Sequence, residues 1–301
     1  MSRRSRMHRT RTGKPIALTE RDFEIFRVLR RYRYLRSTYL HAFAGGLSET
    51  RFKERLGDLF HEGYLGRPEQ QWEFADARFR PVVHAIGSRG LDALRHCAIA
   101  ATDARRGAAH SVQRQFLHTL LACEALASIE LAARSMDGLR FIAWSEILAR
   151  APETTRDSAM PLRLPVPSGG HVTPDGVFGI EYRSESARRY RFFALEADRG
   201  TMPVSRSRPG QTSYLGKLVA YDDVLSRQVH RTHWGIPNLL VLTLTTSAPR
   251  LSEIVSRLGT GNPAFLFKAV ESLVLLTPQP QLLTEPFARA GHDALSIDSS
   301  S

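Results

Sequence analysis

The order in which hydrophobic patterns follow one another in residues 19–94 constrains the fold more than any other feature of this chain. Three stretches with helical spacing come first, and two short strand-like runs joined by a polar segment follow them. The third stretch starts after Ser48 and carries apolar residues at i, i+4, i+7 and i+8, a spacing that places them on one helix face. These residues are Phe52, Leu56, Leu59 and Phe60. The pattern predicts a small module of three helices and a hairpin.

Capping residues and glycines mark where the first two helices begin and end. Thr19, with Asp22 three positions later, is typical of a helix N-terminus and predicts a first helix over residues 19–33. Gly45 and Gly46 end a second, shorter helix that begins near residue 37.

A hairpin completes this module. Strands are expected at residues 63–65 and 81–86, and the polar segment 67–80 between them has the composition of a wing. Three helices followed by such a hairpin are the elements of a winged helix-turn-helix, which we predict for residues 15–98. In that domain the third helix lies in the major groove of DNA while the wing contacts phosphates. A winged helix used for protein contacts is the alternative.

Positive charge is concentrated at the N-terminus. The formal net charge is +12, and residues 1–36, with twelve basic and three acidic side chains, account for nine of it. A segment of this kind predicts contact with the phosphates of double-stranded DNA, and a solubilising tail is the alternative. We predict a disordered basic arm over residues 1–14, with DNA contacts from the arm and from the third helix. The expected DNA-binding residues are Arg3, Arg4, Arg6, Arg9, Arg11, Lys14, Arg51, Lys53 and Arg55.

Cysteine usage and hydropathy indicate the compartment. Cys97 and Cys123 are the two cysteines, without a CxxC motif or zinc spacing, which is typical of a reducing cytoplasm. No apolar segment follows the basic N-terminus as in a signal peptide. The apolar run 236–244 is too short to span a bilayer. We expect a soluble cytoplasmic protein that has no membrane partner.

An alanine-rich stretch separates the two predicted domains. Residues 108–136 are predicted to form one long connector helix. Small side chains permit close helix packing, so we expect this helix to dock the domains or to mediate a homodimer.

Acidic residues at strand ends give the second predicted domain, residues 137–278, its chemical character. Glu196 and Asp198 end an apolar strand and share one of its faces, because side chains alternate along a strand. Two buried carboxylates are costly unless they are paired or bind a metal. With Asp175 on a neighbouring strand, three acids converge on a predicted Mg²⁺ or Mn²⁺ site. The alternative is a structural network with Arg199, Arg206 or Arg208.

The rest of this domain predicts an α/β layout. A helix over residues 211–229 carries Lys217 between two tyrosines, and a strand, a helix and a last strand follow it. The expected fold class is therefore α+β or α/β, with a central mixed sheet flanked by helices. Residues 279–301 are rich in Pro, Gln and Ser and are predicted to be a flexible tail.

The spacing of the acids is similar to a known nuclease motif. Pro174-Asp175 followed after twenty residues by Glu196-x-Asp198 resembles the PD-(D/E)XK motif of restriction-endonuclease-like domains. The resemblance implies that Asp175 and Glu196 hold a metal, that a lysine orients the attacking water, and that Glu146 matches the acid of a preceding helix. The third motif position is Asp198 rather than lysine, so Lys217 is expected to take that role from the helix. Asp175, Glu196, Asp198, Lys217 and Glu146 are the predicted catalytic residues.

The whole chain resembles the replication-relaxation family of plasmid and mobile-element proteins, some of them described as mobilisation accessory proteins. The features that carry this resemblance are the winged helix, the Pro174-Asp175-Gly176 turn, the run 195–201 and Lys217-x-x-x-Tyr221. It implies a DNA-binding accessory factor in replication, relaxation or mobilisation, with a relaxase or replication protein as partner. The alternatives are an active Mg²⁺-dependent endonuclease that nicks DNA and a winged-helix transcriptional regulator.

Overall fold

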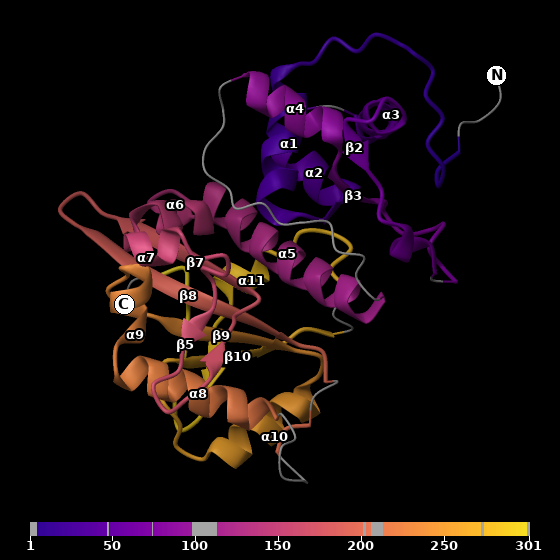
Figure 1. The fold of residues 1–301 in the computed structure, drawn as a ribbon. Coiled ribbons are helices and arrows are strands. Elements are labelled where there is room, and N and C mark those ends of the chain that lie inside the picture. Colours follow the sequence, from indigo (N-terminus) through magenta and orange to yellow (C-terminus); the bar gives the residue numbers. More distant parts are fainter. Residues whose placement is uncertain are drawn as a thin grey trace. The chain divides into compact units, whose positions relative to one another are not determined.

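The computed structural model of this chain describes residues 5–46, 48–73, 75–97, 113–200, 203–205, 213–271 and 274–299. Within them, eleven α-helices and a seven-stranded mixed sheet make an α+β protein (Figure 1). The chain divides into two compact units. Unit 1 comprises Met1–Leu131 and Leu275–Gln279, and unit 2 comprises Ala132–Val274 and Pro280–Ser301.

Helices dominate unit 1, and a small sheet accompanies them. In chain order its elements are α1 (Glu20–Tyr32), β1 (Leu35–Arg36), α2 (Ser37–Ala44), α3 (Glu49–His61), β2 (Leu65–Gly66), a 3₁₀-helix (Glu69–Glu73), β3 (Val83–Ile86), α4 (Ser88–His96) and most of α5 (Gln113–Arg134). The small sheet is antiparallel with the order β1-β3-β2, so the last strand lies in the centre.

The helix starts in unit 1 agree with the capping residues in the sequence. Oδ2 of Asp22 accepts a hydrogen bond from the amide of Thr19 over 2.7 Å and thereby fixes the first turn of α1. Oγ of Ser48 accepts from the amide of Arg51 over 3.4 Å at the start of α3. The predicted apolar face of α3 is buried, with Phe52 2% exposed.

The turn after β3 requires a glycine at residue 90. A Cβ atom at Gly90 would lie 2.5 Å from the carbonyl oxygen of Tyr64, a separation that side-chain carbons do not tolerate. The absence of a side chain therefore lets the N-terminus of α4 pack directly on the chain that leads into β2.

Helix α5 packs in the core of unit 1 as far as Leu131, and residues 98–112 before it, which include the start of the predicted connector helix, lie outside the described part of the chain. Its buried Glu124 pairs with Arg36. Its buried Glu130 accepts hydrogen bonds from Arg31 and Tyr32 of α1. The segment Gln115–Arg134 is long and apolar enough to cross a membrane by length and composition, but 72% of the window is buried inside the protein. Such burial is typical of the core helix of a soluble protein.

The N-terminal segment differs from the disordered arm that composition predicts, because residues 5–14 pack against unit 1. The guanidinium of Arg9 donates to the carbonyls of Phe60 and Leu65 over 2.9 and 2.8 Å. The amide of Thr12 donates to the carboxylate of Glu62 over 2.9 Å. These contacts satisfy the carbonyl groups at the end of α3 and in β2, and the composition of the arm gives no sign of them.

Unit 2 is built on the large sheet. Its strands are β4 (Leu139–Ile142), β7 (Gly176–Arg183), β8 (Arg188–Asp198), β9 (Leu240–Thr245), β10 (Phe265–Ala269), β11 (Phe287–Arg289) and β12 (His292–Leu295), with β5 (Leu164–Pro165) and β6 (His171–Val172) forming a separate hairpin. Its helices are α6 (Trp144–Arg150), α7 (Glu153–Arg156), α8 (Tyr214–Ser226), α9 (Val229–Trp234), α10 (Ala248–Leu258) and α11 (Gln281–Thr284).

The sheet of unit 2 is mixed, with the order β12-β11-β10-β9-β8-β7-β4. Strands β4, β7 and β8 are antiparallel, whereas β8, β9 and β10 run parallel. Residues of β8 at even positions, such as Phe192 and Ala194, belong to the same apolar core as Tyr214 and Leu218 of α8 and Ile254 of α10. These two helices therefore cover the face of β8 that carries the predicted carboxylates.

The predicted flexible tail is wrong for residues 279–299. Strands β11 and β12 form the edge of the large sheet, and Phe287 is completely buried. The hydroxyl of Tyr182 donates to the carbonyl of Ile297 over 2.7 Å. Apolar side chains spaced among the polar ones order this segment, and overall composition does not reveal them.

Candidate functional site

Strand β8 carries two carboxylates at its buried end. Glu196 and Asp198 are two residues apart, so the pleat places both on the face that α8 and α10 cover. Their side chains are only 4% and 3% exposed. Thr243 and Thr245 of β9 lie opposite them in the parallel register. Because burying a carboxylate without a partner is costly, both acids need partners from the covering helices.

Helix α8 supplies the partners of Glu196. Nζ of Lys217 donates to Oε2 of Glu196, and the hydroxyl of Tyr221 donates to Oε1. Burial raises the pKa of Glu196 to about 7 against the opposing charge of Lys217, and the charge of Asp175 adds to the rise. Burial alone would lower the pKa of Lys217, but the charges of Glu196 and Asp175 outweigh it and raise that pKa. The pair is therefore a buried ion pair whose acid takes up a proton near neutral pH.

Asp175 lies immediately before β7 and beside the end of β8. Its amide donates to the carbonyl of Leu195 over 2.9 Å, and its Oδ2 accepts from the amide of Ala197 over 2.8 Å. These bonds place its carboxylate next to Glu196, which explains why its charge acts on both Glu196 and Lys217. The structure thus brings together Asp175, Glu196 and Lys217, three of the residues predicted from the sequence.

Asp198 has a different partner from Glu196. Arg250 of α10 donates from Nε to Oδ2 over 2.6 Å and from Nη2 to Oδ1 over 3.1 Å, which is a bidentate pair. Sequence reasoning missed Arg250 and considered Arg199, Arg206 or Arg208 in its place. Of these, Arg206 and Arg208 lie outside the described residues.

Glu146, the fifth predicted catalytic residue, does not join this cluster. It accepts a hydrogen bond of 2.7 Å from Arg140, whose Nε contacts Glu181 of β7. Glu181 pairs with Tyr190 in the β7–β8 register. Tyr190 precedes Glu196 by six residues, which is about 20 Å along a strand. Glu146 therefore belongs to a separate ion-pair network around Arg140.

The oxygens of the predicted metal ligands Asp175, Glu196 and Asp198 are already used by the protein. Glu196 accepts from Lys217 and Tyr221, and Asp198 accepts from a guanidinium at both oxygens. Within the described residues, no group of three or more His, Cys, Asp or Glu side chains is placed to hold a metal ion. The carboxylate oxygens that would bind Mg²⁺ or Mn²⁺ therefore already accept hydrogen bonds from protein donors. As arranged, these residues do not fit the predicted divalent-metal site.

In unit 1, the N-terminal half of α3 presents its polar side chains to solvent. Thr50, Arg51 and Lys53 are exposed, and Lys53 pairs with Glu49 over 2.6 Å. Arg55 does not share this exposure, because it forms a salt bridge of 2.6 Å with a buried aspartate of α1. Arg51 and Lys53 therefore remain available to a partner, whereas the Arg55 guanidinium holds α3 against α1.

The predicted DNA contacts of the arm are likewise divided. Arg6 and Arg9 donate to backbone carbonyls of unit 1. Arg11 is exposed, and Lys14 pairs with an acid of α3 while its side chain stays 62% exposed. The remaining two, Arg3 and Arg4, lie outside the described residues. Arg9 is also exposed, but its guanidinium is committed to carbonyls of unit 1, so Arg11 and Lys14 are the exposed arm cations of the described segment without such a contact.

The segment between β2 and β3 carries exposed residues that sequence reasoning did not single out. Phe79 is 81% exposed, and the guanidinium of Arg78 lies 5.3 Å from the centre of its ring. Arg80 pairs with Asp76 over 2.8 Å. A polar loop of this length gave no signal for an exposed aromatic residue.

Comparison with known proteins agrees with the resemblance in the sequence. The family model described as replication-relaxation matches residues 26–239, which is more than half of the chain. No curated protein and no solved structure matches the chain.

Proposed function

Because this chain belongs to the replication-relaxation family, we propose that it is a DNA-binding accessory protein in the replication, relaxation or mobilisation of plasmid or mobile-element DNA. Unit 1 makes the contact with double-stranded DNA in this proposal. Unit 2 is a nuclease-like domain that does not cut. A relaxase or replication protein of the same element is the expected partner.

The observation that carries the proposal is the order of elements in unit 1. Elements α1, β1, α2, α3, β2 and β3 follow one another, and β3 lies between the other two strands. This order supports a winged helix-turn-helix in which α3 is the helix that enters the major groove. In such domains the N-terminal residues of that helix contact base edges. Thr50 and Arg51 lie in this part of α3 and are exposed.

The exposed cations around α3 support phosphate contacts in the same proposal. Lys53 follows on the exposed part of the helix, Lys14 and Arg11 belong to the packed arm, and Arg78 lies in the wing. Phosphate contacts fix the position of a protein on the duplex, whereas base contacts determine the sequence that is read. We assign Arg51 to base contact and the other four cations to the backbone.

The second part of the proposal concerns unit 2. The PD-(D/E)XK-like spacing is supported by Asp175 before β7, by Glu196 at the end of β8 and by Lys217 on the next helix. The pairing of both β8 acids with cations speaks for a nuclease-like domain without cleavage activity. A Mg²⁺-dependent endonuclease is the second candidate, favoured by the placement of Asp175 beside the end of β8 that carries Glu196, as the motif requires.

Duplex binding tests the first part. Fluorescence anisotropy with a labelled duplex of about 30 base pairs, titrated at several salt concentrations, gives both the affinity and its salt dependence. We expect R51Q, which removes a base contact, to weaken binding about tenfold with little change in the slope of log K against log salt, whereas K53Q, which removes a phosphate contact, should lower that slope by about 1. The matched control is R95Q, which removes an arginine whose side chain is 67% exposed on α4. Equal losses in R51Q and R95Q, or no duplex binding by the wild type at low salt, would refute the assignment.

Incubation with supercoiled plasmid tests the second part. The proposal predicts unchanged plasmid with Mg²⁺ or Mn²⁺ at protein concentrations that saturate duplex binding. Nicking that disappears in both D175A and E196A would show that the protein is an endonuclease rather than an accessory protein that does not cut.

A further inference from the structure

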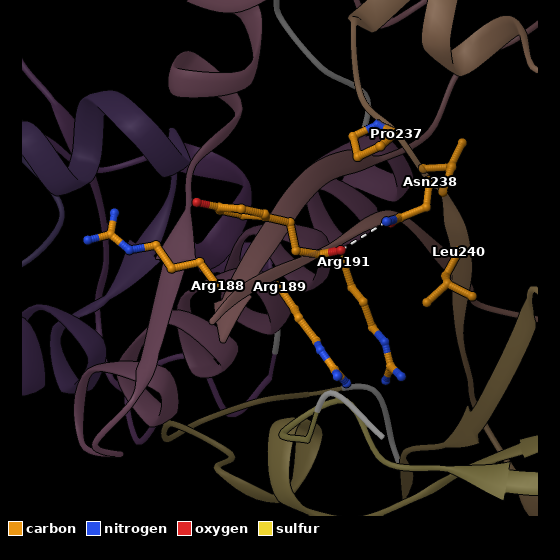
Figure 2. Close-up of a pocket in the computed structure, with 8 residues that line it drawn as sticks. Arg188, Arg189, Arg191, Pro237, Asn238 and Leu240 are labelled. Atoms are coloured by element: carbon orange, nitrogen blue, oxygen red, sulfur yellow. Dashed lines mark hydrogen bonds between the residues drawn. The ribbon is translucent and has the colours of Figure 1, made fainter. Parts of the chain in front are cut away.

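A pocket of about 540 Å³ lies at the start of β8, at the end of the strand opposite the carboxylates. It is lined by Arg188, Arg189, Tyr190 and Arg191 of β8 and by residues 237–240 at the start of β9 (Figure 2). Neither the family match nor the acidic cluster accounts for this concentration of arginines around an aromatic ring.

Tyr190 is unusual because it is 37% exposed in the middle of this basic run. The Arg188 side chain before it is 69% exposed and makes only a long ion pair of 3.8 Å with Glu181. Glu181 already accepts closer contacts from Arg140 and Arg183. The acid therefore offsets little of the charge of Arg188, and the pocket keeps a positive rim.

The backbone under the pocket is held in place. Oδ1 of Asn238 accepts from the amide of Phe192 over 3.0 Å. Its Nδ2 donates to the carbonyl of Tyr190 over 2.9 Å, the bond marked in Figure 2. Arg191 donates to the carbonyl of Ser299 over 2.9 Å. In Figure 2 the side chains of Arg189 and Arg191 extend to the same side, as the pleat requires. The pocket is thus a fixed platform rather than a mobile loop.

We propose that this pocket binds a segment of single-stranded DNA, with a base stacked on Tyr190, the adjoining phosphate contacted by Arg188 on the same face of β8, and a further phosphate contacted by Arg189 on the other face as the DNA passes the start of the strand. A base presents its flat face only when it is unpaired, because a duplex covers that face by stacking. Aromatic rings within a basic groove are the usual means of holding such strands, and they tolerate any base. The volume of the pocket is in the range that small ligands such as a nucleotide occupy. This contact is additional to the duplex contact of unit 1 and does not rest on it.

An acidic protein segment is the competing occupant. It would use the charge of Arg188 and Arg189 but would gain little from the ring of Tyr190. The contribution of the Tyr190 ring to the binding affinity therefore distinguishes single-stranded DNA from an acidic protein segment.

The test measures binding of the full chain to a labelled oligothymidylate of about twelve nucleotides by anisotropy at low salt. We expect Y190A to weaken binding about 5- to 160-fold, the range measured when an aromatic residue that stacks on one base is replaced by alanine. Y190F keeps the ring and should stay within about twofold of the wild type. The double variant R188Q/R189Q should weaken binding and lower the salt slope by about 1.4, since each single-strand phosphate contact contributes about 0.7. The matched control R227Q removes an arginine of unit 2 whose side chain is 67% exposed and should change little.

The proposal is overturned if Y190A binds like the wild type, if Y190F loses as much as Y190A, or if R227Q loses as much as R188Q/R189Q. It is also overturned if a polyglutamate peptide competes as well as unlabelled oligothymidylate, or if a duplex of equal length does. The thermal melting of each variant shows whether it folds. If Y190A does not fold, the single-strand affinity of R188Q/R189Q tests the proposal in its place. Duplex binding of the same variants separates this proposal from the one for unit 1, because Y190A should leave the duplex affinity unchanged.

Discussion

Replacing Glu196 with glutamine should change how the stability of unit 2 depends on pH. The pKa of Glu196 is about 7 in the folded protein, against an ordinary value of 4.5. The folded state therefore holds this proton more tightly than the unfolded state, so the wild type loses stability as the pH rises from 4.5 to 7 and loses little more above 7. At about 1.4 kcal/mol for each pH unit of difference, the loss is about 3 kcal/mol. The side chain is almost fully buried, so solvent does not screen this effect.

Glutamine fills the same space but has no proton to lose, so E196Q lacks this term. Near pH 5 we expect the variant and its parent to have similar free energies of unfolding, and by pH 8 the variant should have gained about 3 kcal/mol relative to the parent. Lys217 adds no slope in the parent, because its raised pKa keeps it protonated throughout this window, and in E196Q the charge of Asp175 continues to oppose the lowering of that pKa by burial. His230 and His233 have lowered pKa values and oppose the trend, but they act equally in both proteins and cancel in the difference.

Urea unfolding followed by tryptophan fluorescence measures this difference. Trp144 and Trp234 belong to unit 2, so a Trp72→Phe background makes the signal report on that unit. The control is E253Q, which alters an acid whose side chain is 45% exposed and should leave the pH dependence unchanged. Parallel stability curves for E196Q and its parent between pH 5 and pH 8 would refute the reasoning.

Three further predictions concern residues that stabilise the interior of one unit or the other. R250M leaves Asp198 buried without its cation and should lower the free energy of unfolding of unit 2, measured in urea, by about 3–5 kcal/mol. The control R257M, at an exposed ion pair, should lower it by less than about 1 kcal/mol. Similar losses in the two variants would show that Asp198 does not depend on Arg250. G90A forces a methyl group against the carbonyl of Tyr64 and should cost about 1–3 kcal/mol, measured through Trp72 fluorescence, and wild-type stability would show that the close approach is absent. Deleting residues 1–14 should lower the melting temperature of unit 1, because the Arg9 and Thr12 contacts are lost. The deletion should also weaken DNA binding and reduce its salt dependence. An unchanged melting temperature would show that these residues are disordered, as their composition predicts.

The sequence predicted those parts of the fold that depend on near neighbours. The capping contact between Thr19 and Asp22 spans three residues, and the buried face of α3 follows from helical spacing alone. The shared face of Glu196 and Asp198 follows in the same way from strand alternation. In each case the deciding interaction lies within one element, so the local pattern contains the information.

Other parts depend on contacts between distant residues, and the sequence does not indicate which of these contacts form. Arg250 lies 52 residues after Asp198 in the sequence. The helix that carries Arg250 starts after Ser247, whose Oγ accepts from the amide of Arg250, but the sequence does not indicate which of the nearby arginines the fold brings to the acid. The ordering of the N-terminal segment has the same cause, because its partners are carbonyl groups about 50 residues away. Composition carries no information about those groups.

Contacts between distant residues also change how many of the basic side chains in the net charge remain available to bind phosphates. Counted along the sequence, the arginines of residues 1–36 suggest a surface devoted to phosphates, yet Arg9 and Arg36 satisfy buried carbonyl and carboxylate groups of unit 1. An arginine that leaves such a contact for DNA gives up a hydrogen bond inside unit 1, and a buried acceptor that is left without any donor costs about 1–3 kcal/mol. In the proposed duplex contact, the binding strength of unit 1 therefore rests on the fewer cations that stay exposed, such as Arg51 and Lys14. The same argument holds in unit 2, where Lys217 and Arg250 are committed to the carboxylates and the exposed arginines of the Tyr190 pocket are Arg188 and Arg189.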